Sequence, residues 1–147
     1  MALFLRRLIE HFSVGILTSV LCTCFLLNVV DTTTKAVVFL VMLLCITLHI
    51  IHFCSCLAEQ WSFTFDPIDY YVINIAVSLL YAAANITMAV KNVEPIYTYI
   101  FLPYKMFTIF DVSKVTSAVL VNLIMIFFII IVPIASRPRG KNRFRGY

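Results

Sequence analysis

The sequence VTSAVLVNLIMIFFIIIVPIA, at residues 115–135, decides the fold class. It contains no Lys, Arg, Asp or Glu, and as a helix it is long enough to cross a hydrocarbon core of about 30 Å. A helix that is apolar on all sides is stable only inside a large protein or in a bilayer. A chain of 147 residues is too short to surround it with protein. This segment is therefore expected to span a membrane.

Three further stretches have the same character, and they bring the expected spans to four. They are residues 12–30, 36–57 and 70–90, and none contains a charged side chain. In the whole chain 63% of the residues are hydrophobic and 12% are charged, against about half and about a quarter in soluble domains. This composition excludes a soluble globular enzyme and a disordered chain. The sequence predicts an all-α membrane protein, in which residues 1–135 form a four-transmembrane-helix antiparallel bundle and residues 136–147 form a basic tail.

The basic residues predict that both ends of this multi-pass protein lie in the cytosol. Four spans put both termini on one side, and Lys and Arg accumulate on the cytosolic side of a membrane. That side would hold Arg6, Arg7, Arg137, Arg139, Lys141, Arg143 and Arg145, whereas the outer loops would hold Lys35, Lys91, Lys105 and Lys114. The five basic residues of the tail are expected to contact anionic lipid of a plasma membrane or an endomembrane. The alternatives are a cleaved signal peptide in the first segment and a fifth span, which would put the tail outside.

Polar side chains recur along the second and third spans at positions i, i+4, i+7 and i+11, a spacing that places each set on one helical face. The second span has Cys45, His49, His52 and Cys56, and the third has Asn74, Ser78, Tyr81 and Asn85. The first span has the shorter stripe Gly15, Ser19 and Cys22, and the fourth has Asn122. Because lipid offers no hydrogen-bond partner, these stripes are expected to pack against one another inside the bundle.

Thiols and imidazoles also bind zinc, copper and haem iron, so a metal, haem or proton-transfer site on the second span is an alternative. Its stripe extends about 16 Å along the helix axis, too far for one ion, and the other expected spans contain no His. We therefore expect no metal, no cofactor and no catalytic residue. Cys54 and Cys56, at the cytosolic end of this span, are candidates for palmitoylation. The alternative for this pair is packing at a helix interface.

Residues 96–110, which read IYTYIFLPYKMFTIF, dominate the outer loop 91–114. This segment is short for a span and suits an interfacial or re-entrant position. Its aromatic residues are Tyr97, Tyr99, Phe101, Tyr104, Phe107 and Phe110. So short a loop is not expected to bury them all, and exposed aromatic patches usually mark contact with a partner. The sequence thus predicts a docking surface here, with anchoring among lipid headgroups as the alternative.

The approach to the third span, WSFTFDPID at residues 61–69, runs directly into YYVINIAVSLLYAAA at residues 70–84. Together with four spans, cytosolic ends and a short first outer loop, this pattern resembles the MARVEL fold of the MAL and chemokine-like-factor relatives. Their third helix likewise follows an aromatic-rich approach and an acidic residue, with an Asn or small residue about a turn later. Asp69 and Asn74 stand at these two places. The resemblance implies a role in membrane apposition, vesicle trafficking or cell-junction organisation, without catalysis.

Three functions remain open at this point. The favoured one is a non-enzymatic organiser or adaptor that acts through helix packing and the aromatic outer loop. The second is a small accessory subunit of a larger membrane complex, and the third is a metal, haem or transport protein centred on the second span. The expected partners are the lipid bilayer and other membrane proteins or a second copy of the chain. No nucleic acid and no small-molecule substrate are expected.

Overall fold

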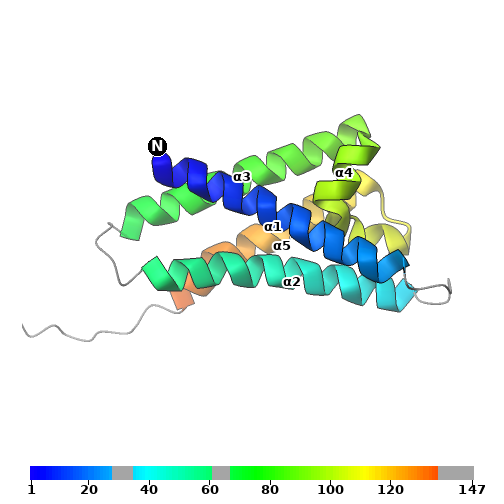
Figure 1. Cartoon of the computed structure of the whole chain (residues 1–147), viewed down its shortest axis with the longest axis horizontal. Helices are drawn as coiled ribbons and strands as arrows, with labels where there is room; N and C mark the ends of the chain where they lie inside the picture. The colour runs from blue at the N-terminus through cyan, green and yellow to red at the C-terminus, as the bar shows by residue number, and fades with distance from the viewer. Residues whose placement is uncertain (28–34, 61–66, 136–147) are drawn as a thin grey trace, which may run out of the picture.

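A computed structural model of the chain, which describes residues 1–27, 35–60 and 67–135, is helical almost throughout these ranges (Figure 1). The long helices are α1 (Ala2–Leu27), α2 (Lys35–Gln60), α3 (Pro67–Lys91) and α5 (Lys114–Ala135). Between α3 and α5 lie a short helix, α4 (Glu94–Phe101), and a 3-10 helix, η1 (Leu102–Phe110). No strand occurs in the described ranges. The prediction of an all-α protein is confirmed.

Four helices are long and apolar enough to cross a membrane, over Leu3–Cys24, Lys35–Cys54, Val72–Lys91 and Lys114–Val132. Length and composition thus support a multi-pass membrane protein. The first of these segments starts well before residue 12, where the sequence predicts the start of a span. In this earlier stretch Glu10 pairs with Arg6 at 2.8 Å and with Arg7 at 2.6 Å within the helix. Pairing at this helical spacing offsets charges that otherwise oppose burial.

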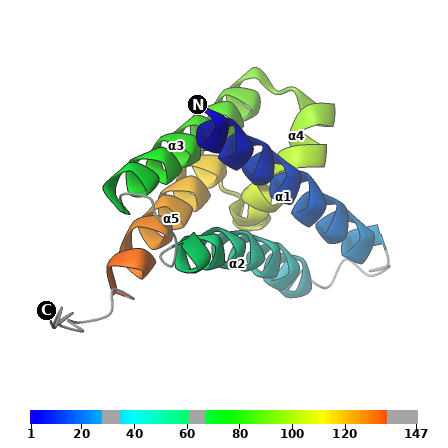
Figure 2. The ribbon, with the colours of Figure 1, turned by 60° about the vertical axis from the view of Figure 1, so that its left-hand side comes forward.

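The four long helices pack in a ring. Consecutive long helices run in alternate directions, with α2 returning along α1 (Figure 1). Each long helix packs against two others, in the ring order α1, α2, α5, α3. Figure 2 shows the α3–α5 pair side by side. This arrangement turns one face of each helix toward a shared interior.

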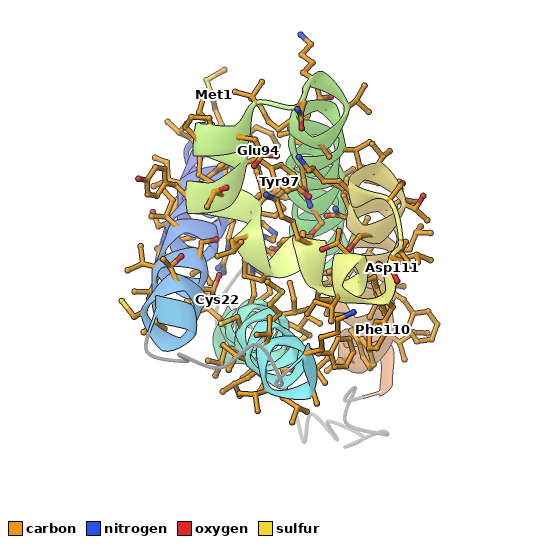
Figure 3. All side chains as sticks on the ribbon, turned by 90° about the vertical axis from the view of Figure 1, so that its right-hand side faces the viewer. Met1, Cys22, Glu94, Tyr97, Phe110 and Asp111 are labelled. Carbon is orange, nitrogen blue, oxygen red and sulfur yellow. The ribbon has the colours of Figure 1, made fainter. Side chains whose placement is uncertain are left out.

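Helices α4 and η1 close one end of this ring, and together we term them the cap. α4 packs against α1 and α3, while η1 packs against α2 and α5. Seen from this end, the cap runs across the space between the long helices (Figure 3). Pro103 stands in the first turn of η1, where proline is tolerated because the first N–H groups of a helix have no intrahelical partner. Asn92 and Asp111, the residues that follow α3 and η1, adopt left-handed conformations with φ of 55° and 61°, which Asn and Asp tolerate well.

Ser117 of α5 fastens the inner side of the cap. Its hydroxyl donates to the carbonyl oxygen of Tyr104 at 2.7 Å and accepts from the backbone N–H of Phe107 at 3.1 Å. The hydroxyl of Tyr104 in turn donates to Sδ of Met125 at 2.9 Å. Both ends of Tyr104 are thereby bonded to α5, and its position is fixed.

A charged cluster fastens the outer side of the cap. Glu94 of α4 pairs with Lys105 of η1 at 2.9 Å and also with Lys114 of α5. Nζ of Lys105 lies 5.0 Å from the centre of the Tyr97 ring, within the range of a cation–π contact. Burial lowers the pKa of Lys105 and raises the pKa of Tyr97, because apolar surroundings disfavour the charged form of each.

The aromatic side chains of the cap are divided between the core and the surface. Tyr97, Phe101 and Tyr104 are at most 1% exposed and belong to the core. Their spacing of i, i+4 and i+7 turns them to the side of the cap that faces the long helices. These three side chains are therefore not on the exposed surface at which the sequence predicts docking. Tyr99 and Phe110 are exposed, by 67% and 57%, and Phe107 is half-buried.

Gly15 of α1 provides a test of this packing, because the absence of a Cβ atom lets Tyr81 of α3 approach closely. A Cβ atom at Gly15 would overlap the Tyr81 hydroxyl, and Tyr81 is fully buried. We expect Gly15→Ala to reduce the free energy of unfolding by about 1–3 kcal/mol, the usual cost of overpacking, measured as a lower Tm in detergent.

Two further variants make this test specific. Adding Tyr81→Phe to Gly15→Ala removes the overlapping hydroxyl and should recover part of the loss. Ser13→Ala, at an exposed position of α1, should leave the Tm unchanged. A Gly15→Ala protein as stable as the wild type would contradict the close contact.

Candidate functional site

The polar faces of α1, α2 and α3 meet at two histidines inside the bundle. Nδ1 of His11 lies 3.0 Å from Nε2 of His49, and Nε2 of His11 lies 3.3 Å from Oγ of Ser78. The Ser78 hydroxyl donates to the carbonyl oxygen of Asn74 at 2.8 Å. These side chains are buried, and both histidines have no exposed surface. We term His11, His49, Ser78 and Asn74 the histidine cluster; its contacts join three helices.

Aromatic rings enclose the histidine cluster. The ring of His11 stacks on that of Phe53, with the ring centres 3.4 Å apart, and lies parallel to Tyr81 at 5.2 Å. Beyond Tyr81, the cap rings of Phe101 and Tyr104 follow at 5.1 Å and 5.7 Å. The histidine cluster is therefore connected to the cap by a continuous series of ring contacts.

The structure places most of the predicted polar stripes in the interior. The α3 set, Asn74, Ser78, Tyr81 and Asn85, is at most 2% exposed. In α2, Cys45 and His49 are buried and His52 is half-buried, while the side chain of Cys56 lies outside the described residues. Gly15, Ser19, Cys22 and Asn122 are buried too. The ring of helices brings these side chains toward one another, as interhelical packing in lipid requires.

Reasoning from the sequence misses His11, because it places the membrane surface just before residue 12. A signal was nevertheless present in the spacing of α1. His11, Gly15, Thr18 and Cys22 follow the same i, i+4, i+7 and i+11 pattern as the stripes of α2 and α3, and all four are buried. Extending the first stripe by one turn toward the N-terminus would have included His11.

The distance between the histidines fits a hydrogen bond better than a shared metal ion. Two nitrogens at about 2.0–2.1 Å from a tetrahedral zinc ion lie about 3.3 Å apart, whereas those of His11 and His49 lie 3.0 Å apart. The other nitrogen of His11 contacts Ser78. In the described part of the chain, no group of three or more His, Cys, Asp or Glu side chains is placed to hold a metal ion.

Further polar atoms are buried around the histidine cluster. Several of these atoms have no hydrogen-bond partner among the described residues. They are Nδ1 of His49, the hydroxyls of Ser19 and Tyr97, both amide atoms of Asn85 and Oδ1 of Asn122. Leaving such an atom unpaired costs about 1–3 kcal/mol. The interior therefore carries more hydrogen-bonding capacity than the contacts between the helices use.

A groove of about 290 Å³ opens between α2 and α5. It is lined by Thr47, Ile50, Ile51, Cys54, Phe128 and Val132. The Thr47 hydroxyl donates to the carbonyl oxygen of Leu43, so the groove is mainly apolar. Cys54, a candidate for palmitoylation, is half-buried in its wall.

Some predicted features lie outside the described residues. They are the basic residues Arg137, Arg139, Lys141, Arg143 and Arg145, and residues 61–66 of the MARVEL-like stretch. No known protein family, curated protein or solved structure matches the chain. The resemblance to the MARVEL fold therefore rests on the sequence pattern. One residue of that pattern, Asn74, belongs to the histidine cluster.

A double-mutant cycle tests the contact between the two histidines. His11→Leu and His49→Leu should each lower the Tm in detergent, because each removes an interhelical hydrogen bond worth about 0.6–2 kcal/mol. The double variant should lose less than the sum of the two, since the first substitution already breaks the shared bond. Leu44→Ala, on the exposed face of α2, serves as the control. Strictly additive losses would show that the two side chains do not interact.

Proposed function

We propose that this chain is a non-enzymatic membrane organiser or adaptor, with a role in membrane apposition, trafficking or cell-junction assembly. The observation that carries the proposal is the direction of the side chains. The polar ones, including the histidine cluster, bind neighbouring helices. The outer faces present aliphatic residues suited to lipid and to lateral contact, among them Leu17, Leu40, Leu79 and Leu123. The polar side chains, which could otherwise bind a ligand or take part in a reaction, thus hold the bundle together.

The cap supplies the surface for recognition in this proposal. With both termini in the cytosol, as the basic residues indicate, the cap lies on the outer side of the membrane. Ile96, Tyr99 and Phe110 remain exposed there, by 45%, 67% and 57%. Exposed aromatic side chains on a rigid support are typical anchors of protein interfaces, and the two sets of bonds to α5 make the cap such a support.

A second candidate, a small accessory subunit of a larger membrane complex, is favoured by the groove between α2 and α5. Its apolar wall faces outward, where a neighbouring transmembrane helix can insert a side chain. Purification in a native-like detergent distinguishes the two functions. A lone or self-associated protein supports the organiser, and a stoichiometric unlike partner supports the subunit. Bound metal or a haem absorption band would instead support a redox or transport role.

Two tyrosines of α4 provide a matched test of the recognition surface. Tyr99→Ala should preserve the Tm and membrane insertion but weaken partner binding or self-association by about 30-fold, as loss of a 2 kcal/mol anchor would. Tyr97→Ala should lower the Tm, because it leaves a cavity in the core, at a cost of about 3–5 kcal/mol. Crosslinking in cells measures the first effect and thermal unfolding the second.

An unchanged crosslinking pattern in the Tyr99→Ala protein would contradict the proposed surface. A Tyr99→Ala protein that gives the wild-type pattern of crosslinked adducts would show that the exposed side of α4 contacts lipid headgroups and not a protein.

A further inference from the structure

The hydrogen bonds of the histidine cluster determine which ring nitrogen of His11 carries a hydrogen. Ser78 has one hydroxyl hydrogen, which it donates to the carbonyl oxygen of Asn74. In its contact with His11, the Ser78 oxygen must therefore accept. Nε2 of His11 is the donor across these 3.3 Å. Nδ1 of a neutral His11 then has a lone pair and no hydrogen.

The same assignment of hydrogens extends to the ring nitrogens of His49. Because Nδ1 of His11 has no hydrogen, it accepts one from Nε2 of His49 across 3.0 Å. A neutral His49 with its hydrogen on Nε2 has a lone pair on Nδ1. That atom is buried and has no hydrogen-bond partner among the described residues. The series of bonds from Asn74 through Ser78 and His11 thus ends in an unused acceptor.

We propose that Nδ1 of His49 is a proton-binding site at the junction of α1, α2 and α3. A proton can bind there without breaking a hydrogen bond of the histidine cluster, because Nε2 of His49 continues to donate to His11. A proton on Nδ1 of His11 would instead remove that bond. The histidine cluster accordingly takes up one proton at one defined atom.

The surroundings of this site oppose a positive charge in the intact bundle. The titratable groups next to His49 are His11 of α1, His52 of α2 and Tyr81 of α3, and the charged side chain of Arg7 lies near His11. Glu10 is paired with Arg6 and Arg7. Within the described ranges no carboxylate forms an ion pair with His49. An added proton would therefore create a buried charge without a counter-ion, which is costly in a membrane interior.

Proton binding is consequently coupled to loosening of the three-helix junction. A loosened bundle, in which water reaches His49, binds more protons than the intact one. Stability then rises with pH and falls with acid. The loss is expected as the pH decreases through the range near about 6.5, where an exposed histidine titrates. Beyond the proposed organising role, this gives the bundle a sensitivity to acid.

The experiment measures the Tm of the purified full chain in a neutral detergent, between about pH 8 and about pH 5, on either side of the histidine range. The wild type should lose about 2–8 °C on acidification. His49→Gln retains a side-chain N–H that can donate to His11 but lacks the second ring nitrogen, so it should remove most of this loss. His52→Gln, one turn away on α2, is the matched control and should retain it.

Each outcome either supports or overturns the proposed proton-binding site. A wild-type loss on acidification that persists in His49→Gln, or that disappears in His52→Gln, overturns the proposed site. Nitrogen-15 spectra of histidine-labelled wild-type protein provide a second measurement that needs no variant. At neutral pH they should show a hydrogen on Nε2 and none on Nδ1 for both His11 and His49. A hydrogen on Nδ1 of His49 would overturn the proposal even if the variant failed to fold.

Discussion

The hydrogen bond between His11 and His49 is the constraint on which the rest of the structure depends. In a bilayer a polar side chain finds its partner inside the bundle or has none. This bond sets the rotation of α1 relative to α2, and the contact with Ser78 sets α3 relative to both. In the orientation that results, Gly15 faces Tyr81 one turn along α1. The close approach of α1 and α3 at Gly15 thus lies one turn from the contact between His11 and Ser78.

The cap depends on the same orientation. Because Tyr81 lies against α1, its ring is available to Phe101 and Tyr104, which fill the end of the bundle. Ser117 and the pair between Glu94 and Lys114 then hold the cap on α5. The inner side of the cap is used for packing, and its outer side remains for contact. This division would let one aromatic segment serve both stability and the proposed recognition.

The sequence was sufficient to predict the class of fold, because few arrangements of a chain accommodate so much apolar surface. Long runs without charge leave membrane spans as the main solution, and the periodicity of Asn74, Ser78, Tyr81 and Asn85 indicates one interior face. The start of α1 was missed because Arg6, Arg7 and Glu10 end the uncharged run before residue 12, whereas the helix continues through them with these charges paired. Burial of Tyr97 depends on packing against other helices, which residue order alone does not specify. The partner of His49 likewise depends on the register between helices, and periodicity contains no information about it.

The most direct measurement of the central contact is nitrogen–nitrogen dipolar transfer in bilayers, with all histidines labelled with nitrogen-15. The chain has 3 His, so the His52→Gln background leaves only His11 and His49 to observe. A cross-peak between Nδ1 of His11 and Nε2 of His49 is expected, with the intensity of a 3.0 Å separation. If transfer within each ring is visible but no cross-peak joins the two rings, then α1 and α2 are not held together by this bond.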